Sequence, residues 1–139
     1  MSENREITNT VGRLVVTLEI ESGVLKKFRY AEGCDAISFS LTKADLAGVQ
    51  SIGRQAFFCC SSLTSIEIPE GVTDIGDEAF WYCISLTSIV IPNSVTSIDN
   101  CTFFDCSSLT SIEIPNSVIS IGGRAFIGCG SLASIMIPN

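Results

Sequence analysis

The sequence predicts a repeat solenoid: a coil of short parallel strands and short helical or 3₁₀ turns, preceded by an N-terminal cap that contains a β-hairpin. Three observations predict it. A 23-residue unit occurs four times, at 49–71, 72–94, 95–117 and 118–139. Each unit places Val-x-x-Ile, a Phe and a Cys at fixed positions, and each closes on Leu-x-x-Ile-x-Ile-Pro. A fixed period of this length is typical of units that bury their apolar faces only by stacking on their neighbours.

The Leu-x-x-Ile-x-Ile segments predict one wall of the coil. They alternate inward and outward positions, which is typical of short strands. Each is followed by a proline, which has no N–H to donate to a sheet and therefore ends the strand. We expect parallel strands, one in each repeat, at 65–68, 88–91, 111–114 and 134–137.

The Val-x-x-Ile-Gly segments predict the opposite wall. Gly53, Gly76 and Gly122 are expected at a tight corner, where the backbone needs the freedom of glycine. Asp99 replaces the glycine in the third repeat, and we expect it to adopt a left-handed conformation. A short helical or 3₁₀ turn should then carry the Phe of each repeat into the core.

Residues 1–48 do not follow the period. Two alternating segments, 13–21 and 24–30, flank Ser22-Gly23, which predicts a hairpin. Residues 34–46 read as a degenerate repeat, with Ile37, Phe39 and Leu41 on one face. Because a solenoid needs a terminal unit with a polar outer face, we interpret residues 1–48 as an N-terminal cap rather than a separate domain.

No capping pattern follows the last predicted strand. Three interpretations remain open: a longer protein continues the coil, two chains associate end to end into a homo-oligomer, or the exposed edge is tolerated.

Composition limits the classes of partner. With 46% hydrophobic and 17% charged residues, the chain is expected to fold rather than to stay disordered. Residues 49–139 hold eight acidic side chains and only two basic ones, Arg54 and Arg124, so nucleic acid and anionic membrane are not expected partners.

No apolar run is long enough for membrane insertion. The polar N-terminus lacks a secretory signal and predicts a cytoplasmic location for the chain as given; secretion or surface display remains open if a signal was trimmed.

The cysteines predict a structural column rather than a disulfide framework. Cys60, Cys83, Cys106 and Cys129 occupy one repeat position. Parallel neighbours lie about 4.8 Å apart with their side chains side by side, whereas the Cβ atoms of a disulfide lie about 3.8 Å apart. We therefore expect buried, reduced thiols, which suit a reducing compartment.

The whole unit, Val-x-x-Ile-Gly-x-x-Ala-Phe-x-x-Cys-x-x-Leu-Thr-Ser-Ile-x-Ile-Pro, resembles the BspA-like leucine-rich repeats of bacterial and protist surface proteins. Four copies carry the resemblance, over residues 49–139. It implies a curved, right-handed leucine-rich-repeat solenoid that binds other proteins or host-surface components, often in secreted or anchored proteins. Residues 1–48 carry no such resemblance.

Two surfaces are candidate binding sites. The outward strand positions form a mildly acidic face for a protein partner, of the kind that solenoids use for binding: Ser65, Glu67, Ser88, Val90, Ser111, Glu113, Ser134 and Met136. The residues after the core Phe form either an exposed apolar stripe or a row partly buried against the next coil: Phe58, Trp81, Phe104 and Ile127.

The sequence offers little for catalysis or for a cofactor. Histidine is absent, and a cysteine or serine nucleophile would lack a base. The carboxylates of Glu67 and Glu113 are expected about 9.6 Å apart, but nothing else supports hydrolysis. Asp74, Asp77, Glu78 and Asp99 lack calcium-loop spacing, and no Cys-x-x-Cys pair suggests zinc, so no metal is predicted. We expect a protein-interaction module and not an enzyme; the alternatives are a self-assembling structural protein and a fragment of a cell-surface adhesin.

Overall fold

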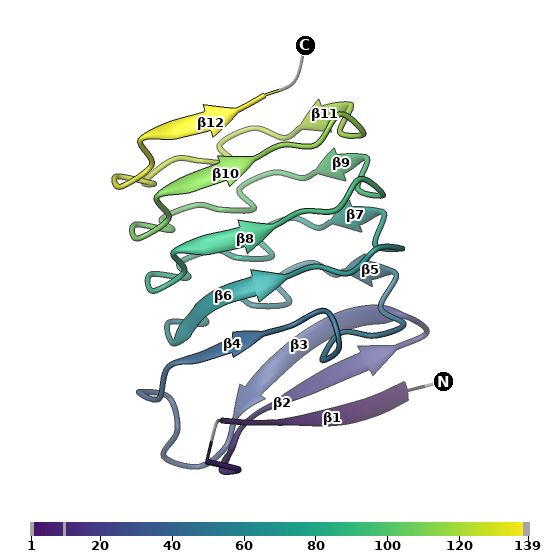
Figure 1. Ribbon diagram of the computed structural model, residues 1–139, viewed down its shortest axis with the longest axis vertical. Coiled ribbons are helices and arrows are strands. Elements are labelled where there is room, and N and C mark those ends of the chain that lie inside the picture. Colours follow the sequence, from purple (N-terminus) through teal and green to yellow (C-terminus); the bar gives the residue numbers. More distant parts are fainter. Residues whose placement is uncertain (1, 10, 138–139) are drawn as a thin grey trace.

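The protein is a β-solenoid, seen in a computed structural model that describes residues 2–9 and 11–137. Its coils stack along the long axis of the molecule, with the N-terminal strands at one end and β12 at the other (Figure 1). We number the coils by the predicted repeats, from coil one (49–71) to coil four (118–137). The predicted fold class is confirmed. Pro138 and Asn139 lie outside the described residues.

One wall of the coil holds one parallel strand per turn. The alternating Leu and Ile side chains of the first three repeats are buried in the core, which fixes the face that each strand buries. Five strands stand side by side and fall into two sheets, β4-β6-β8 and β10-β12. The predicted strands are present, and β6 starts two residues earlier than expected. The strands are β4 (Phe39–Leu41), β6 (Leu63–Glu67), β8 (Ser88–Val90), β10 (Ser111–Glu113) and β12 (Ser134–Met136).

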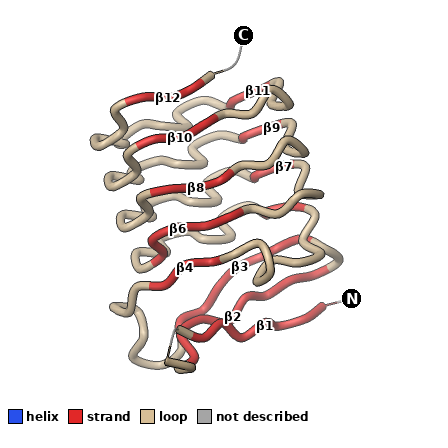
Figure 2. The backbone as a smooth tube through the Cα atoms, viewed as in Figure 1, coloured by secondary structure: helices blue, strands red, loops and turns tan. Residues whose placement is uncertain are grey.

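The opposite wall is a single seven-stranded sheet in the order β1-β2-β3-β5-β7-β9-β11. The first three strands pair antiparallel and the others pair parallel. The short strands of the coils are joined by longer loops and turns (Figure 2). The predicted hairpin is confirmed as β2 and β3. Strand β1 was not predicted, because Ile7 is its only buried residue and the strand lacks a clear apolar alternation. The strands are β1 (Ser2–Thr8), β2 (Leu14–Glu21), β3 (Val24–Tyr30), β5 (Ser51–Ile52), β7 (Asp74–Ile75), β9 (Ser97–Ile98) and β11 (Ser120–Ile121).

The predicted helical turns are wrong, because no helix occurs among the described residues. In coil one, the N–H groups of Ala56, Phe58 and Cys60 close consecutive turns on carbonyls three residues back. The N–H groups between them, of Gln55, Phe57 and Cys59, donate instead to carbonyls of coil two. Half of the backbone donors therefore bond between coils, which a helix would not allow.

The corner glycines serve close packing rather than an unusual φ. A Cβ on Gly53 would lie 2.8 Å from the carbonyl oxygen of Leu25, and one on Gly76 would lie 2.8 Å from the Arg54 nitrogen. The left-handed conformation expected for Asp99 is wrong. In that coil it occurs at Cys101 and Asp105, with φ of 57° and 58°, where the consecutive turns need it.

The core is a column of stacked phenylalanines between the two walls. Neighbouring rings lie 5.3–5.5 Å apart, centroid to centroid, from Phe57 through Phe80 and Phe103 to Phe126. Phe28 of β3 stacks on Phe57 at 6.1 Å and so joins the N-terminal strands to the first repeat. Coil four is less covered: Phe126 is half-buried, while the other three rings of the column are fully buried.

Candidate protein-binding surface

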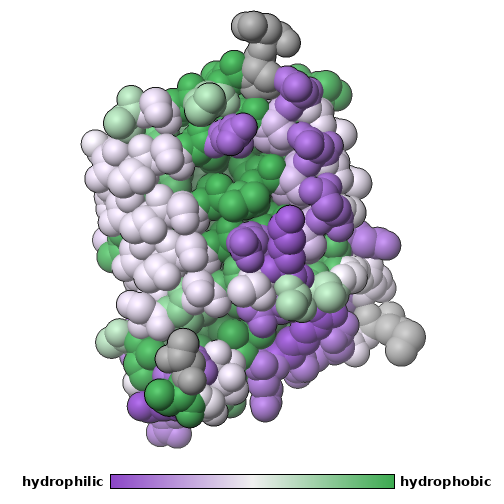
Figure 3. Space-filling view, in the orientation of Figure 1, coloured by the Kyte–Doolittle hydropathy of each residue, from purple (hydrophilic) through white to green (hydrophobic). Residues whose placement is uncertain are grey.

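The strand face is the set of eight outward residues predicted above, on β6, β8, β10 and β12. Ser65 is half-buried and the other seven are exposed. The side chains of Val90 and Met136 are 50% and 64% exposed. A hydrophobic band runs across the coils on this side of the molecule, between a pale column and a hydrophilic column (Figure 3).

Two carboxylates on this face lack a cationic partner. Glu67 and Glu113 are exposed, and neither takes part in an ion pair among the described residues. The face is therefore both apolar and negatively charged.

The strand wall opens between β8 and β10. These strands are neighbours but form no ladder, which is why the wall divides into two sheets. The amide of Ile68 donates to the carbonyl of Val90 at 3.1 Å, and the amide of Ile114 donates to that of Met136 at 2.9 Å. The equivalent bond, from Ile91 to the carbonyl of Glu113, is not formed in the described part of the chain.

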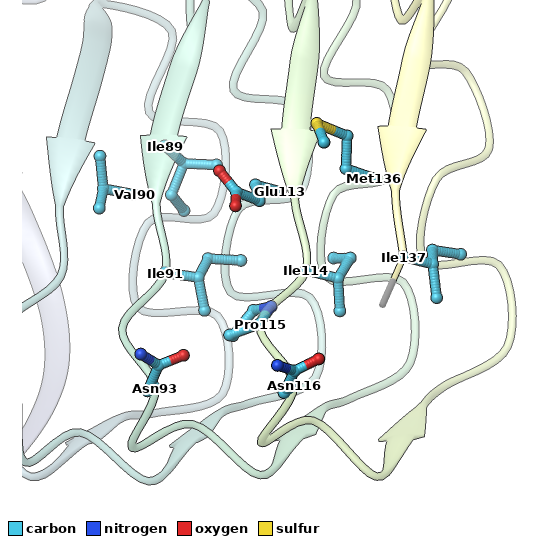
Figure 4. Close-up of a pocket in the computed structure, with 10 residues that line it drawn as sticks. All are labelled: Ile89, Val90, Ile91, Asn93, Glu113, Ile114, Pro115, Asn116, Met136 and Ile137. Atoms are coloured by element: carbon cyan, nitrogen blue, oxygen red, sulfur yellow. The ribbon is translucent and has the colours of Figure 1, made fainter. Parts of the chain in front are cut away.

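A groove lies over this opening, with a volume of about 440 Å³. The side chains of Glu113 and Met136 stand on one side, and those of Asn93 and Asn116 lie in a row on the other (Figure 4). The apolar part of the lining consists of Ile89, Val90, Ile91, Ile114, Pro115, Met136 and Ile137. A volume of this size falls in the usual range of ligand sites.

The predicted apolar stripe is a second aromatic stack. The Trp81 ring lies 4.2 Å from that of Phe104 and 6.0 Å from that of Phe58, with interplanar angles of 10° and 23°. Trp81 and Phe104 are half-buried, whereas Phe58 is 37% and Ile127 50% exposed. Since these rings face one another, they present their edges to solvent, and no flat face of Trp81 remains for a sugar or a nucleobase.

The cysteine column lies in the core. All seven cysteines are free, and Cys60, Cys83 and Cys106 are buried. Each later thiol donates to the carbonyl of the core phenylalanine in the coil before it, at 3.1–3.2 Å, which keeps the thiol protonated: Cys83 to Phe57, Cys106 to Phe80 and Cys129 to Phe103. Burial raises the pKa of Cys60 and of Cys106 to about 12.

Acidic side chains gather at the corner on the opposite wall, around a pocket of about 130 Å³ lined in part by Asp77, Asp99 and Asn100. Desolvation, followed by the charges of Asp77 and Asp74, raises the pKa of Asp99. Within residues 2–9 and 11–137, no three His, Cys, Asp or Glu side chains converge as a metal site would require. No helix in these ranges is long and apolar enough to span a membrane.

Comparison with known proteins identifies the family of the repeats. A family model described as the BspA type leucine-rich repeat region matches residues 27–139 in six copies. It begins within β3 and so includes part of the segment that the sequence analysis set apart. No curated protein matches the chain in sequence.

Several solved structures share the fold. A leucine-rich repeat protein from Bacteroides capillosus is 24% identical with a TM-score of 0.70; the match covers 96% of this chain and 99% of that one. The pneumococcal vaccine antigen PcpA is 24% identical with a TM-score of 0.74, over 96% of this chain but only 31% of its own. A leucine-rich repeat protein from Bacteroides ovatus is 28% identical with a TM-score of 0.61, over 89% of this chain and 40% of its own.

Proposed function

The chain belongs to the BspA-type leucine-rich repeat family, and we propose that it is a protein-interaction module that binds its partner on the strand face. The proposal is carried by one observation: exposed Val90 and Met136 line the same groove as Glu113, whose carboxylate forms no ion pair within the described part of the chain. Apolar side chains on a rigid wall provide binding energy at little cost in entropy, and polar groups beside them provide orientation.

A peptide-display selection tests this proposal. Random peptides are selected on the wild-type chain and measured against a variant with alanine at Glu67, Val90, Glu113 and Met136. We expect the selected peptides to lose at least tenfold in affinity. A matched variant with alanine at Phe58 and Ile127, the two most exposed residues of the predicted apolar stripe, should keep its affinity. Equal affinity for the wild type and the strand-face variant would refute the proposal.

Self-association is a second candidate function, because coil four exposes residues that other coils bury. Ile135 and Ile137 are 36% and 63% exposed, whereas Ile66 and Ile68 of coil one are 1% and 0% exposed. A second copy placed against this coil would cover them and pair with the outer edge of β12. Light scattering over a range of concentrations should show a dimer that Ile135→Lys abolishes; a mass that stays monomeric at high concentration would refute it.

A reducing environment is part of the proposal, and it is supported by seven free cysteines of which four are hydrogen-bonded as thiols. Alkylation of the protein in its native cells, before any reductant is added, should modify all seven after denaturation. Disulfide-linked pairs would argue instead for the surface location that the family resemblance implies.

A further inference from the structure

The groove that crosses β8, β10 and β12 differs from the rest of the strand face in charge, in hydrogen-bond acceptors and in strand pairing. We propose that it binds a segment of a partner protein in which an arginine stands beside an aliphatic residue, with the guanidinium on Glu113 and the aliphatic side chain against Val90 and Met136. This inference rests on the proposed function and specifies its partner.

The charge of Glu113 favours a cationic ligand. Glu113 lines the groove and has no ion-pair partner among the described residues. The two basic residues of the repeat region, Arg54 and Arg124, are absent from the groove lining, and Arg54 pairs with Glu78 on the other wall. The charge of Glu113 would therefore repel an anionic ligand, whereas a cationic ligand would supply the partner that this carboxylate lacks.

The hydrogen-bond acceptors around the groove favour arginine over lysine. A carboxylate and the amide oxygens of Asn93 and Asn116 surround the same groove. Arginine carries five donors in a planar fork that suits a carboxylate and has donors left for a neighbouring amide, whereas lysine offers a compact point charge. Arginine is therefore the better match.

The missing ladder between β8 and β10 leaves backbone groups and apolar side chains accessible to a ligand. Without a ladder between β8 and β10, the amide of Ile91 and the carbonyl of Glu113 do not bond to each other. Ile89 and Ile91 are 7% and 8% exposed, against 1% and 0% for the equivalent residues of coil one. Within coils one to three, the apolar floor of the wall is thus most accessible at Ile89 and Ile91, beside Glu113.

The test is fluorescence polarisation with short synthetic peptides, titrated against the intact chain. The probe carries the core Leu-Arg-Leu, and matched probes replace the arginine with lysine, citrulline or glutamate. We expect saturable binding of the arginine probe, about threefold weaker binding of the lysine probe, and at least tenfold weaker binding of the citrulline and glutamate probes. Raising the salt concentration should weaken the binding of the arginine and lysine probes but not that of the uncharged citrulline probe.

Variants locate the site. Glu113→Gln should weaken the arginine probe about tenfold and leave the citrulline probe unchanged. Glu6→Gln, an exposed residue on β1, removes the same charge far from the groove and should change nothing. Val90→Thr should weaken both probes, because it makes the wall polar without a change of fold, which thermal unfolding verifies.

Two results would overturn the inference: equal loss of affinity in Glu6→Gln and Glu113→Gln, which would mean a diffuse charge effect, or arginine and glutamate probes that bind equally. The display selection and the probe titrations together distinguish a failure of the arginine inference from a failure of the proposed function. If display selection yields peptides that need the strand face but carry no cation, the module stands and the arginine inference fails. If no selected peptide needs the face, the function itself fails.

Discussion

The repeats provide a test of how much the position of a coil determines its stability. Ile75 and Ile121 occupy the same place in coils two and four, yet Ile75 is 0% exposed and Ile121 is 40% exposed. Replacing each in turn by alanine removes the same atoms from the same backbone environment. A difference between the two losses in the free energy of unfolding therefore measures how much a following coil stabilises the coil that it covers.

The magnitudes follow from burial. Ile75→Ala loses the transfer free energy of the side chain and leaves a cavity between two coils, which together cost about 3 kcal/mol. Ile121 is about three-fifths buried, and full burial of an isoleucine contributes about 2 kcal/mol, so its replacement should cost about 1 kcal/mol. Water can enter the space at coil four, so the cavity adds little there.

Urea unfolding followed by the fluorescence of Trp81, the one tryptophan in the chain, measures both variants with the same probe. With a slope of about 2 kcal/mol per molar urea, the midpoint of Ile75→Ala should lie about 1 M below that of Ile121→Ala. The slope should be unchanged in both variants, since a changed slope would mean that coils unfold separately. Equal midpoints would refute the reasoning and would mean that coil four is as well covered as coil two.

Three further predictions follow. In the native protein at pH 8, Ellman's reagent should react rapidly with Cys59 and Cys101, slowly with the half-buried, hydrogen-bonded Cys129, and with all seven thiols after denaturation; rapid reaction of Cys60, Cys83 or Cys106 would contradict a buried column. Because the pKa of Asp99 is raised in the folded state, the native protein holds this proton at a pH where the unfolded chain has lost it, so stability falls as the pH rises through that window. Asp99→Asn should therefore raise Tm at pH 7 but not at pH 3, and an equal rise at both would contradict this cause. Phe104→Leu removes the ring that stacks on Trp81 at 4.2 Å, so it should cost about 1 kcal/mol and shift the Trp81 emission to longer wavelength; an unchanged spectrum would mean that the stack does not persist in solution.

Much of the fold was predictable because a repeat makes equivalent positions share one environment. The alternation around Ile66 and Ile68 identified the inward face of β6, and the proline after each such pair limited the strand. The turn residues Ser22 and Gly23 were enough to place the hairpin of β2 and β3, since a two-residue turn between alternating segments has few other solutions. The candidate strand face was found in the same way, because alternation also identifies the residues that point outward.

Features that depend on hydrogen bonds between coils or between strands could be seen only in the structure. The segment around Phe57 forms turns rather than a helix because half of its amides donate to the next coil, and a single repeat contains no sign of that choice. The edge strand β1 carries too few apolar residues to be predicted, since its position depends on pairing with β2. The groove beside Glu113 includes the place where β8 and β10 form no ladder, although their sequences match the pattern of the paired strands. The sequence by itself determined the period and the direction of each side chain, which are local properties. Only the tertiary structure decided the spacing between coils, because that spacing depends on how all the side chains of two neighbouring coils pack together.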